Sequence, residues 1–178
     1  ASILEASALN EDGYYKIGDE ISVTLRFTRN VIVTGMPKLT LETGSTDRVA
    51  SYSSGSESLT LTFNYIVQEG DYSSKLQYVS ASALSLNGGS IKDLLDRDAL
   101  IPLPEPGATN SLSGNKNISV DGIIPSIGNV IDGLGENDLE FSSSLSELSF
   151  NWTGFNDNTS SGIKGFFIGI GSSPGETN

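Results

Sequence analysis

The sequence predicts an all-β protein folded as an antiparallel sandwich, and three observations lead to this prediction. Apolar and polar residues alternate over long stretches, turn residues interrupt the alternation at regular intervals, and no segment repeats its apolar residues with the period of a helix. About seven short strands punctuated in this way are typical of a β-sandwich rather than a barrel.

Two segments carry the alternation most clearly. Residues 21–28 place Ile, Val, Leu and Phe at every second position, and residues 59–67 do the same with Leu, Leu, Phe, Tyr and Val, so one face of each strand is expected to be buried. Shorter strands are predicted at residues 3–8, 38–43, 48–53, 75–80 and 117–121. Gly-containing turns such as Asp12-Gly13, Gly70-Asp71 and Asn87-Gly88-Gly89 separate them.

The chain divides into two predicted modules. Residues 91–99 are interpreted as a loop rather than one helical turn, and residues 102–114, with three of the six prolines, as a second loop before a closing strand within 112–121. We expect a complete β-sandwich module at residues 1–121 and a second, truncated module at 122–178, with strands at 148–152 and 163–170. The first module is long enough to bury a core, whereas about 55 residues are marginal alone.

The composition excludes several classes of chemistry. The chain has no Cys and no His, which removes disulfides, thiolate nucleophiles, Ser-His-Asp hydrolases and most zinc enzymes. With 10 Lys and Arg against 22 Asp and Glu, the net charge is −12, so nucleic acid and anionic membrane surfaces are poor partners. No stretch approaches the ~20 apolar residues of a membrane-spanning helix.

The residues of the first module resemble those of a known family. The runs Gly-Tyr-Tyr-Lys-Ile-Gly-Asp-Glu-Ile-Ser-Val at 13–23, Val-Ile-Val-Thr-Gly-Met-Pro-Lys-Leu-Thr-Leu at 31–41 and Leu-Ser-Leu-Asn-Gly-Gly-Ser-Ile-Lys-Asp at 84–93, with the closing segment 118–125, resemble repeat modules of large bacterial surface adhesins. Such modules are Ig-like or cadherin-like β-sandwiches. In the second module, Leu148–Phe155 and 161–171 look like the first half of a fibronectin type III-like domain.

The resemblance implies a non-enzymatic structural or adhesive role. The chain would then be a spacer or ligand platform of a secreted or cell-surface bacterial protein, with the neighbouring repeat modules of the same parent chain as partners. A fold does not transfer a ligand, so two alternatives stay open. One is a module that binds a surface glycan or protein, and the other is an accessory domain of a large extracellular hydrolase.

Calcium is the cofactor that the resemblance implies, because cadherin-like arrays bind it between modules. The candidate ligands here are Glu5, Asp93, Asp96, Asp98 and Asp121, whose oxygens suit this hard cation. The segment around Asp121 carries fewer acids than a cadherin linker, and Glu5 would face a preceding module. Asp93, Asp96 and Asp98 could also form a loop site by themselves, although their spacing lacks the Gly and the terminal Glu of an EF-hand. Solvated loop acids are the alternative interpretation.

The other polar and aromatic residues point away from catalysis. Glu11, Asp12, Asp19, Glu20 and Asp71 fall in predicted turns, where an Asp side chain ordinarily bonds its own backbone. A two-carboxylate glycosidase would need an aromatic-lined cleft, whereas the single Trp, Trp152, lies in a strand pattern and is expected in the core. The six tyrosines suit either strand pairing or adhesive contact.

Overall fold

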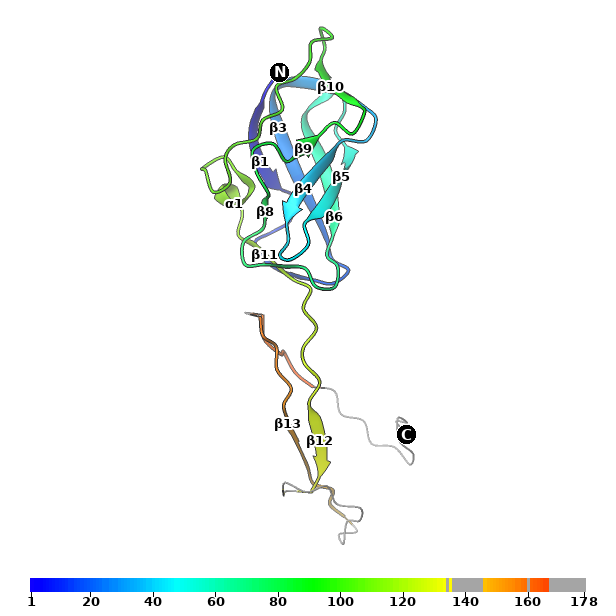
Figure 1. Cartoon of the computed structure of the whole chain (residues 1–178), viewed down its shortest axis with the longest axis vertical. Coiled ribbons are helices and arrows are strands. Elements are labelled where there is room, and N and C mark those ends of the chain that lie inside the picture. Colours follow the sequence, from blue (N-terminus) through cyan, green and yellow to red (C-terminus); the bar gives the residue numbers. More distant parts are fainter. Residues whose placement is uncertain (134, 136–145, 160, 167–178) are drawn as a thin grey trace. The chain divides into compact units, whose positions relative to one another are not determined.

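The computed structural model describes residues 1–133, 135, 146–159 and 161–166. The chain separates into two compact units, Ala1–Ile123 (unit 1) and Ile124–Asn178 (unit 2). Nearly all regular structure is β, in antiparallel sheets that curl into a sandwich-like arrangement in unit 1 (Figure 1), so the predicted all-β class is confirmed.

The larger sheet of unit 1 runs in the order β1-β3-β6-β5-β4-β8. Its strands are β1 (Ile3–Ala8), β3 (Glu20–Thr34), β4 (Lys38–Glu42), β5 (Arg48–Ser54), β6 (Ser58–Ile66) and β8 (Gln77–Tyr78), with β9 (Leu84–Ser85) paired to β4 and β10 (Ser90–Asp93) paired to β3. The strand β3 continues past the predicted end at residue 28, because its second half pairs with β10, a strand that we interpreted as part of a loop.

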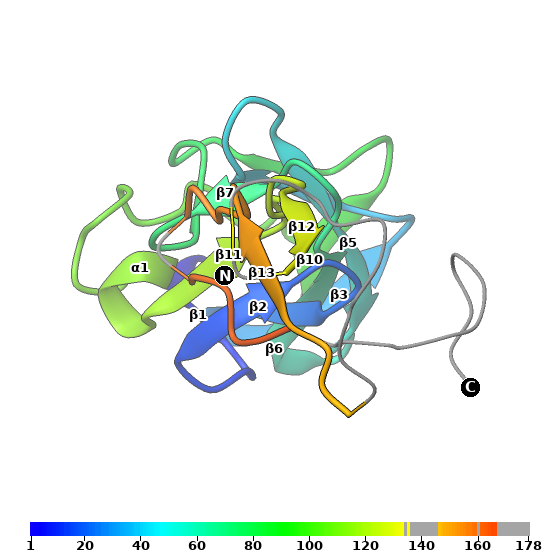
Figure 2. The same ribbon diagram turned by 90° about the horizontal axis from the view of Figure 1, so that it is seen from below.

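A smaller sheet closes one end of unit 1. It contains β2 (Gly13–Lys16), β11 (Ile118–Asp121) and β7 (Tyr72–Ser73), which lie side by side in Figure 2. The central strand β11 pairs in parallel with β2 and antiparallel with β7. We predicted a turn rather than a strand near Gly13, because a four-residue strand whose partner lies about a hundred residues away leaves no local signal.

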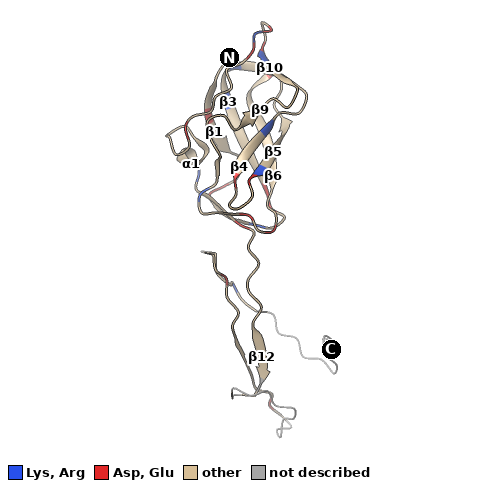
Figure 3. Cartoon of the chain, in the orientation of Figure 1, with Lys and Arg blue, Asp and Glu red and all other residues tan. Residues whose placement is uncertain are grey.

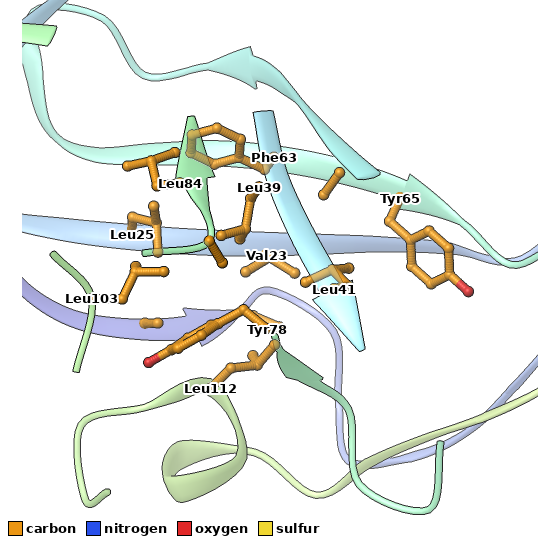
Figure 4. Packing of buried hydrophobic residues seen from close by; sticks show 14 of the residues in the cluster. Val23, Leu25, Leu39, Leu41, Phe63, Tyr65, Tyr78, Leu84, Leu103 and Leu112 are labelled. Carbon is orange, nitrogen blue, oxygen red and sulfur yellow. The ribbon is translucent and has the colours of Figure 1, made fainter. Parts of the chain in front are cut away.

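The core follows the predicted alternation. The inward residues of β3 and β6 are buried, and Figure 4 shows Leu39 and Leu41 of β4 gathered with Val23, Leu25 and Tyr78 in one cluster. This apolar cluster supplies the main driving force for folding of the unit.

Two expectations about this core were wrong in detail. Leu59, assigned to the buried face of β6, is 41% exposed, since the pairing of β3 with β6 shifts between Arg26 and Val31 and leaves this position outside the regular register. The predicted closing strand begins only at β11. The residues before it form one helical turn, α1 (Leu112–Asn115). The N-cap residue Ser111 accepts a hydrogen bond from the Gly114 amide through its side chain, and Leu112 is buried.

In unit 2, the strands β12 (Asn129–Asp132) and β13 (Phe150–Thr153) form a two-stranded antiparallel sheet. The predicted strand at 148–152 therefore corresponds to β13, displaced by one or two residues. Of the strand predicted at 163–170, residues 163–166 are not in a strand, and 167–170 lie outside the described residues.

Candidate functional site

The loop that follows β10 is organised around the side chain of Asp93. This carboxylate is 3% exposed and accepts hydrogen bonds from the backbone amides of Leu95 (2.9 Å) and Arg97 (3.2 Å) and from Arg97 Nε (2.9 Å). The Arg97 guanidinium and these amides hold the pKa of the Asp93 carboxyl well below its usual range. Asp93 thus stabilises a turn, in which its negative charge is already matched by a cation.

Of the other carboxylates in the predicted calcium set, Asp96 and Asp98 belong to this same loop. Asp96 Oδ1 accepts a hydrogen bond from Lys92 Nζ at 2.9 Å, and the Asp98 backbone pairs with that of Lys92. Glu5 lies away from the loop, with its Oε2 3.8 Å from Arg26 Nη1 on the outer face of β1 and β3. Asp121 ends β11, at the opposite end of unit 1 from β10 (Figure 1), where its Oδ1 accepts from the Ile123 amide.

The five predicted calcium ligands therefore do not converge on one place. No group of three or more His, Cys, Asp or Glu residues able to hold a metal ion occurs in the described part of the chain. The charged residues near the β10 loop mix both signs (Figure 3), with Lys92 and Arg97 beside Asp93 and Asp96. Calcium binding by this loop stays a prediction, and the pairing of Lys92 and Arg97 with its carboxylates does not favour it.

The most developed polar site of unit 1 surrounds Asp71, which we call the Asp71 cluster: Arg48, Tyr65 and Asp71. The Asp71 side chain is 1% exposed. Its Oδ1 accepts from Arg48 Nε at 2.6 Å, and its Oδ2 accepts from the Tyr65 hydroxyl at 2.6 Å and from the Gln68 amide at 2.8 Å. A buried carboxylate is tolerated only when it is paired and hydrogen-bonded in this way.

The cluster changes the pKa of the Tyr65 phenol. Burial of its ring, together with the hydrogen bond to Asp71, raises the pKa of the Tyr65 phenol far above its ordinary value. The phenol therefore stays a donor over the whole physiological range. Sequence reasoning assigned Asp71 to turn chemistry; this is correct for its bond to Gln68 but missed Arg48 and Tyr65, which reach it from β5 and β6.

The backbone of the same turn holds the segment that leaves unit 1. The Gly122 amide donates to the Asp71 carbonyl oxygen at 2.7 Å, and the Gly70 amide donates to the Gly122 carbonyl oxygen at 2.9 Å. A Cβ on Gly122 would lie 2.1 Å from the Gln68 carbonyl oxygen, so only glycine allows this approach. The next residue, Ile123, is bonded to Asp121 through its amide.

Two of the remaining predicted turn acids, Asp12 and Asp19, have structural roles. Asp19 Oδ2 accepts from the Lys16 amide at 2.9 Å, as expected for a turn, and Asp12 Oδ1 accepts from the Asn117 amide at 2.8 Å. Asp12 thus connects the turn before β2 to the segment before β11. Both contacts support the small sheet.

Trp152 is not a core residue in the described part of unit 2. Its side chain is 44% exposed, although its ring lies 6.0 Å from that of Phe150 and 5.4 Å from that of Phe166. The prediction of burial was therefore wrong: the ring contacts neighbouring aromatic rings of the described residues but keeps nearly half of its surface exposed.

An open cavity of about 410 Å³ lies on the side of unit 1, beside β9. Ser80, Ser82 and Glu105 contribute polar groups, and Leu84, Ile101 and Pro102 contribute apolar surface. The Ser80 and Ser82 hydroxyl oxygens are 3.0 Å apart and bonded to each other.

Comparison with known proteins gives no family for this chain. No family model, no curated protein sequence and no solved structure matches it. In the part of the chain that the structure describes, no helix is both long enough and apolar enough to span a membrane.

Proposed function

We propose that unit 1 is a load-bearing spacer module of a multi-repeat bacterial surface protein. One observation carries the proposal: the chain begins at one end of unit 1 and leaves at the other, and the strand at each end is held by pairing (Figure 1). A module of this form adds its own length to a tandem array.

The pairing of the terminal strands supports a mechanical role. The first strand, β1, is paired with the long strand β3 over Ile3–Ala8, and the last strand, β11, lies between β2 and β7. Tension on the two ends of unit 1 therefore acts on strands that must lose their ladders of hydrogen bonds before the core is exposed. The side chains reinforce this arrangement, since no buried side-chain nitrogen or oxygen in the described residues lacks a partner.

The resemblance of residues 13–41 and 84–93 to adhesin repeats supports a cell-surface or extracellular setting, with neighbouring repeats of the parent chain as partners. The net charge of −12 favours solubility and mutual repulsion of such chains. The proposed role involves no catalysis.

Single-molecule force spectroscopy on the full chain tests the proposal. Since the chain has no Cys, cysteine handles at the two termini define the pulling points. Unit 1, Ala1–Ile123, should unfold in one step that releases about 400 Å of chain, at about 3.3–3.6 Å per residue. Phe63→Ala, which removes a fully buried ring, should lower the force of this step. Gradual extension without such a step would contradict a load-bearing role.

A second candidate function is recognition of a small polar ligand, and the cavity beside β9 favours it. The hydroxyls of Ser80 and Ser82 and the Glu105 carboxylate, together with the apolar lining, suit a neutral sugar. A glycan array probed with the wild type and with Glu105→Gln tests this candidate. Binding that the substitution removes would support it, and equal signals from both proteins would count against this cavity.

A further inference from the structure

Asp71 accepts hydrogen bonds both through its side chain and through its backbone carbonyl oxygen. Its buried carboxylate is held by Arg48 from β5 and by Tyr65 from β6, the central strands of the large sheet. Its backbone carbonyl oxygen accepts the Gly122 amide, directly after β11 of the small sheet. One residue thus joins the large sheet to the segment that leaves unit 1.

The contact at Gly122 leaves little room for movement. The two backbone bonds that pair Gly122 with Asp71 and Gly70 measure 2.7 and 2.9 Å. Gly122 lies so close to the Gln68 carbonyl oxygen that a Cβ at this position would not fit, so the chain contacts the turn of residues 68–71 directly. Gln68 is in turn fixed by its amide, which donates to Asp71 Oδ2.

We propose that the Asp71 cluster is a conformational device that fixes the point at which the chain leaves unit 1 and transfers tension from residue 122 to β5 and β6. Asp71 acts as a positioning residue, because its side chain holds the turn whose backbone binds Gly122. The segment held in this way ends with Ile123, whose amide donates to Asp121 Oδ1. The anchoring of Gly122 is independent of the spacer role, and only the transfer of tension rests on that proposed function.

Amide hydrogen exchange on the full chain tests the anchoring. Asp71→Asn keeps the shape of the side chain but removes the charge that pairs with Arg48. We expect the Gly70 and Gly122 amides to exchange at least ~10-fold faster, and by a larger factor than the amides of β3 and β6. As a matched control, Glu5→Gln removes a carboxylate from the exposed pair with Arg26, whose two atoms are 3.8 Å apart, and should change neither amide.

Two outcomes would overturn the anchoring. One is an unchanged exchange rate at Gly122 in Asp71→Asn, and the other is an equal acceleration over all of unit 1. If Asp71→Asn does not fold, Tyr65→Phe provides the same readout, because it removes one hydrogen bond to Asp71 and leaves the ion pair with Arg48 in place. It should accelerate exchange at the same two amides.

Two pulling geometries test the transfer of tension separately. Cysteine handles at Ala1 and Ile124 place the Asp71 cluster in the path of the force, whereas handles at Ala1 and Asn117 bypass both β11 and the cluster. Asp71→Asn should lower the unfolding force more in the first geometry than in the second. An equal effect in both would refute the transfer of tension, even where hydrogen exchange upholds the anchoring.

Discussion

The substitution Tyr65→Phe isolates one bond of the Asp71 cluster. It removes the hydroxyl that donates to Asp71 Oδ2 at 2.6 Å and keeps the ring, which is 2% exposed, so that no cavity forms. A hydrogen bond to a charged acceptor contributes about 1.5–3 kcal/mol to stability. Since Asp71 retains Arg48 and the Gln68 amide, we expect the lower part of this range, about 1.5–2 kcal/mol.

Urea unfolding followed by far-UV circular dichroism measures this loss. The midpoint should fall with an unchanged m-value, and the melting temperature of a unit of this size should fall by about 6–8 °C. Tyr14→Phe, at a side chain that is 61% exposed, is the matched control and should change the free energy of unfolding by less than about 0.5 kcal/mol. A loss in Tyr65→Phe no larger than in this control would refute the assignment of a buried, charged hydrogen bond at Asp71.

Four other predictions concern pH, the core and calcium. Burial raises the pKa of Tyr78 to about 12, and that of Tyr65 further. Because both exceed the unfolded value of about 10, the stability that these tyrosines contribute should be complete below pH ~10 and should fall above it. An alkaline titration of the unfolding free energy should show a less steep fall in Tyr65→Phe. The lowered pKa of Asp93 has the opposite sign, so its contribution is present above the unfolded pKa of about 4 and is lost as the pH falls below it; an acid titration in which Asp93→Asn matches the wild type would contradict this. Leu61→Ala should cost about 2–5 kcal/mol, since this side chain is fully buried, whereas Leu59→Ala, at a side chain 41% exposed, should cost under about 1 kcal/mol in the same denaturation assay. Because Asp93 is already paired with a cation, millimolar Ca²⁺ should leave the melting temperature of unit 1 unchanged, and a rise abolished by Asp93→Asn would reveal a calcium site in this loop.

Local pattern was sufficient for the long strands but not for the short ones. The alternation in β3 and β6 predicted which residues face the core, with the exception of Leu59, because a strand has a period of two and one face must leave water. By contrast, β2, β7, β9 and β10 have two to four residues each. Their pairing comes from partners distant in sequence, and a segment this short has no detectable period.

The candidate site shows the same division. The Gly70-Asp71 turn was predictable, since these residues favour turns, but nothing near Asp71 in the sequence indicates Arg48 or Tyr65. Conversely, Asp93, Asp96, Asp98, Asp121 and Glu5 looked like one acidic set, whereas four of them have basic partners or amides of their own. Charge composition predicts a surface, not which charges meet on it.

Composition and alternation thus determined the all-β class, the buried faces of the long strands and the exclusion of Cys- and His-dependent chemistry, since these depend on residue types and on the fixed period of a strand. Only the tertiary structure decided that β11 lies between β2 and β7 and that Asp71 joins Arg48, Tyr65 and Gly122. Such contacts connect residues up to about a hundred positions apart, and their energies depend on burial and distance, which exist only after the chain has folded.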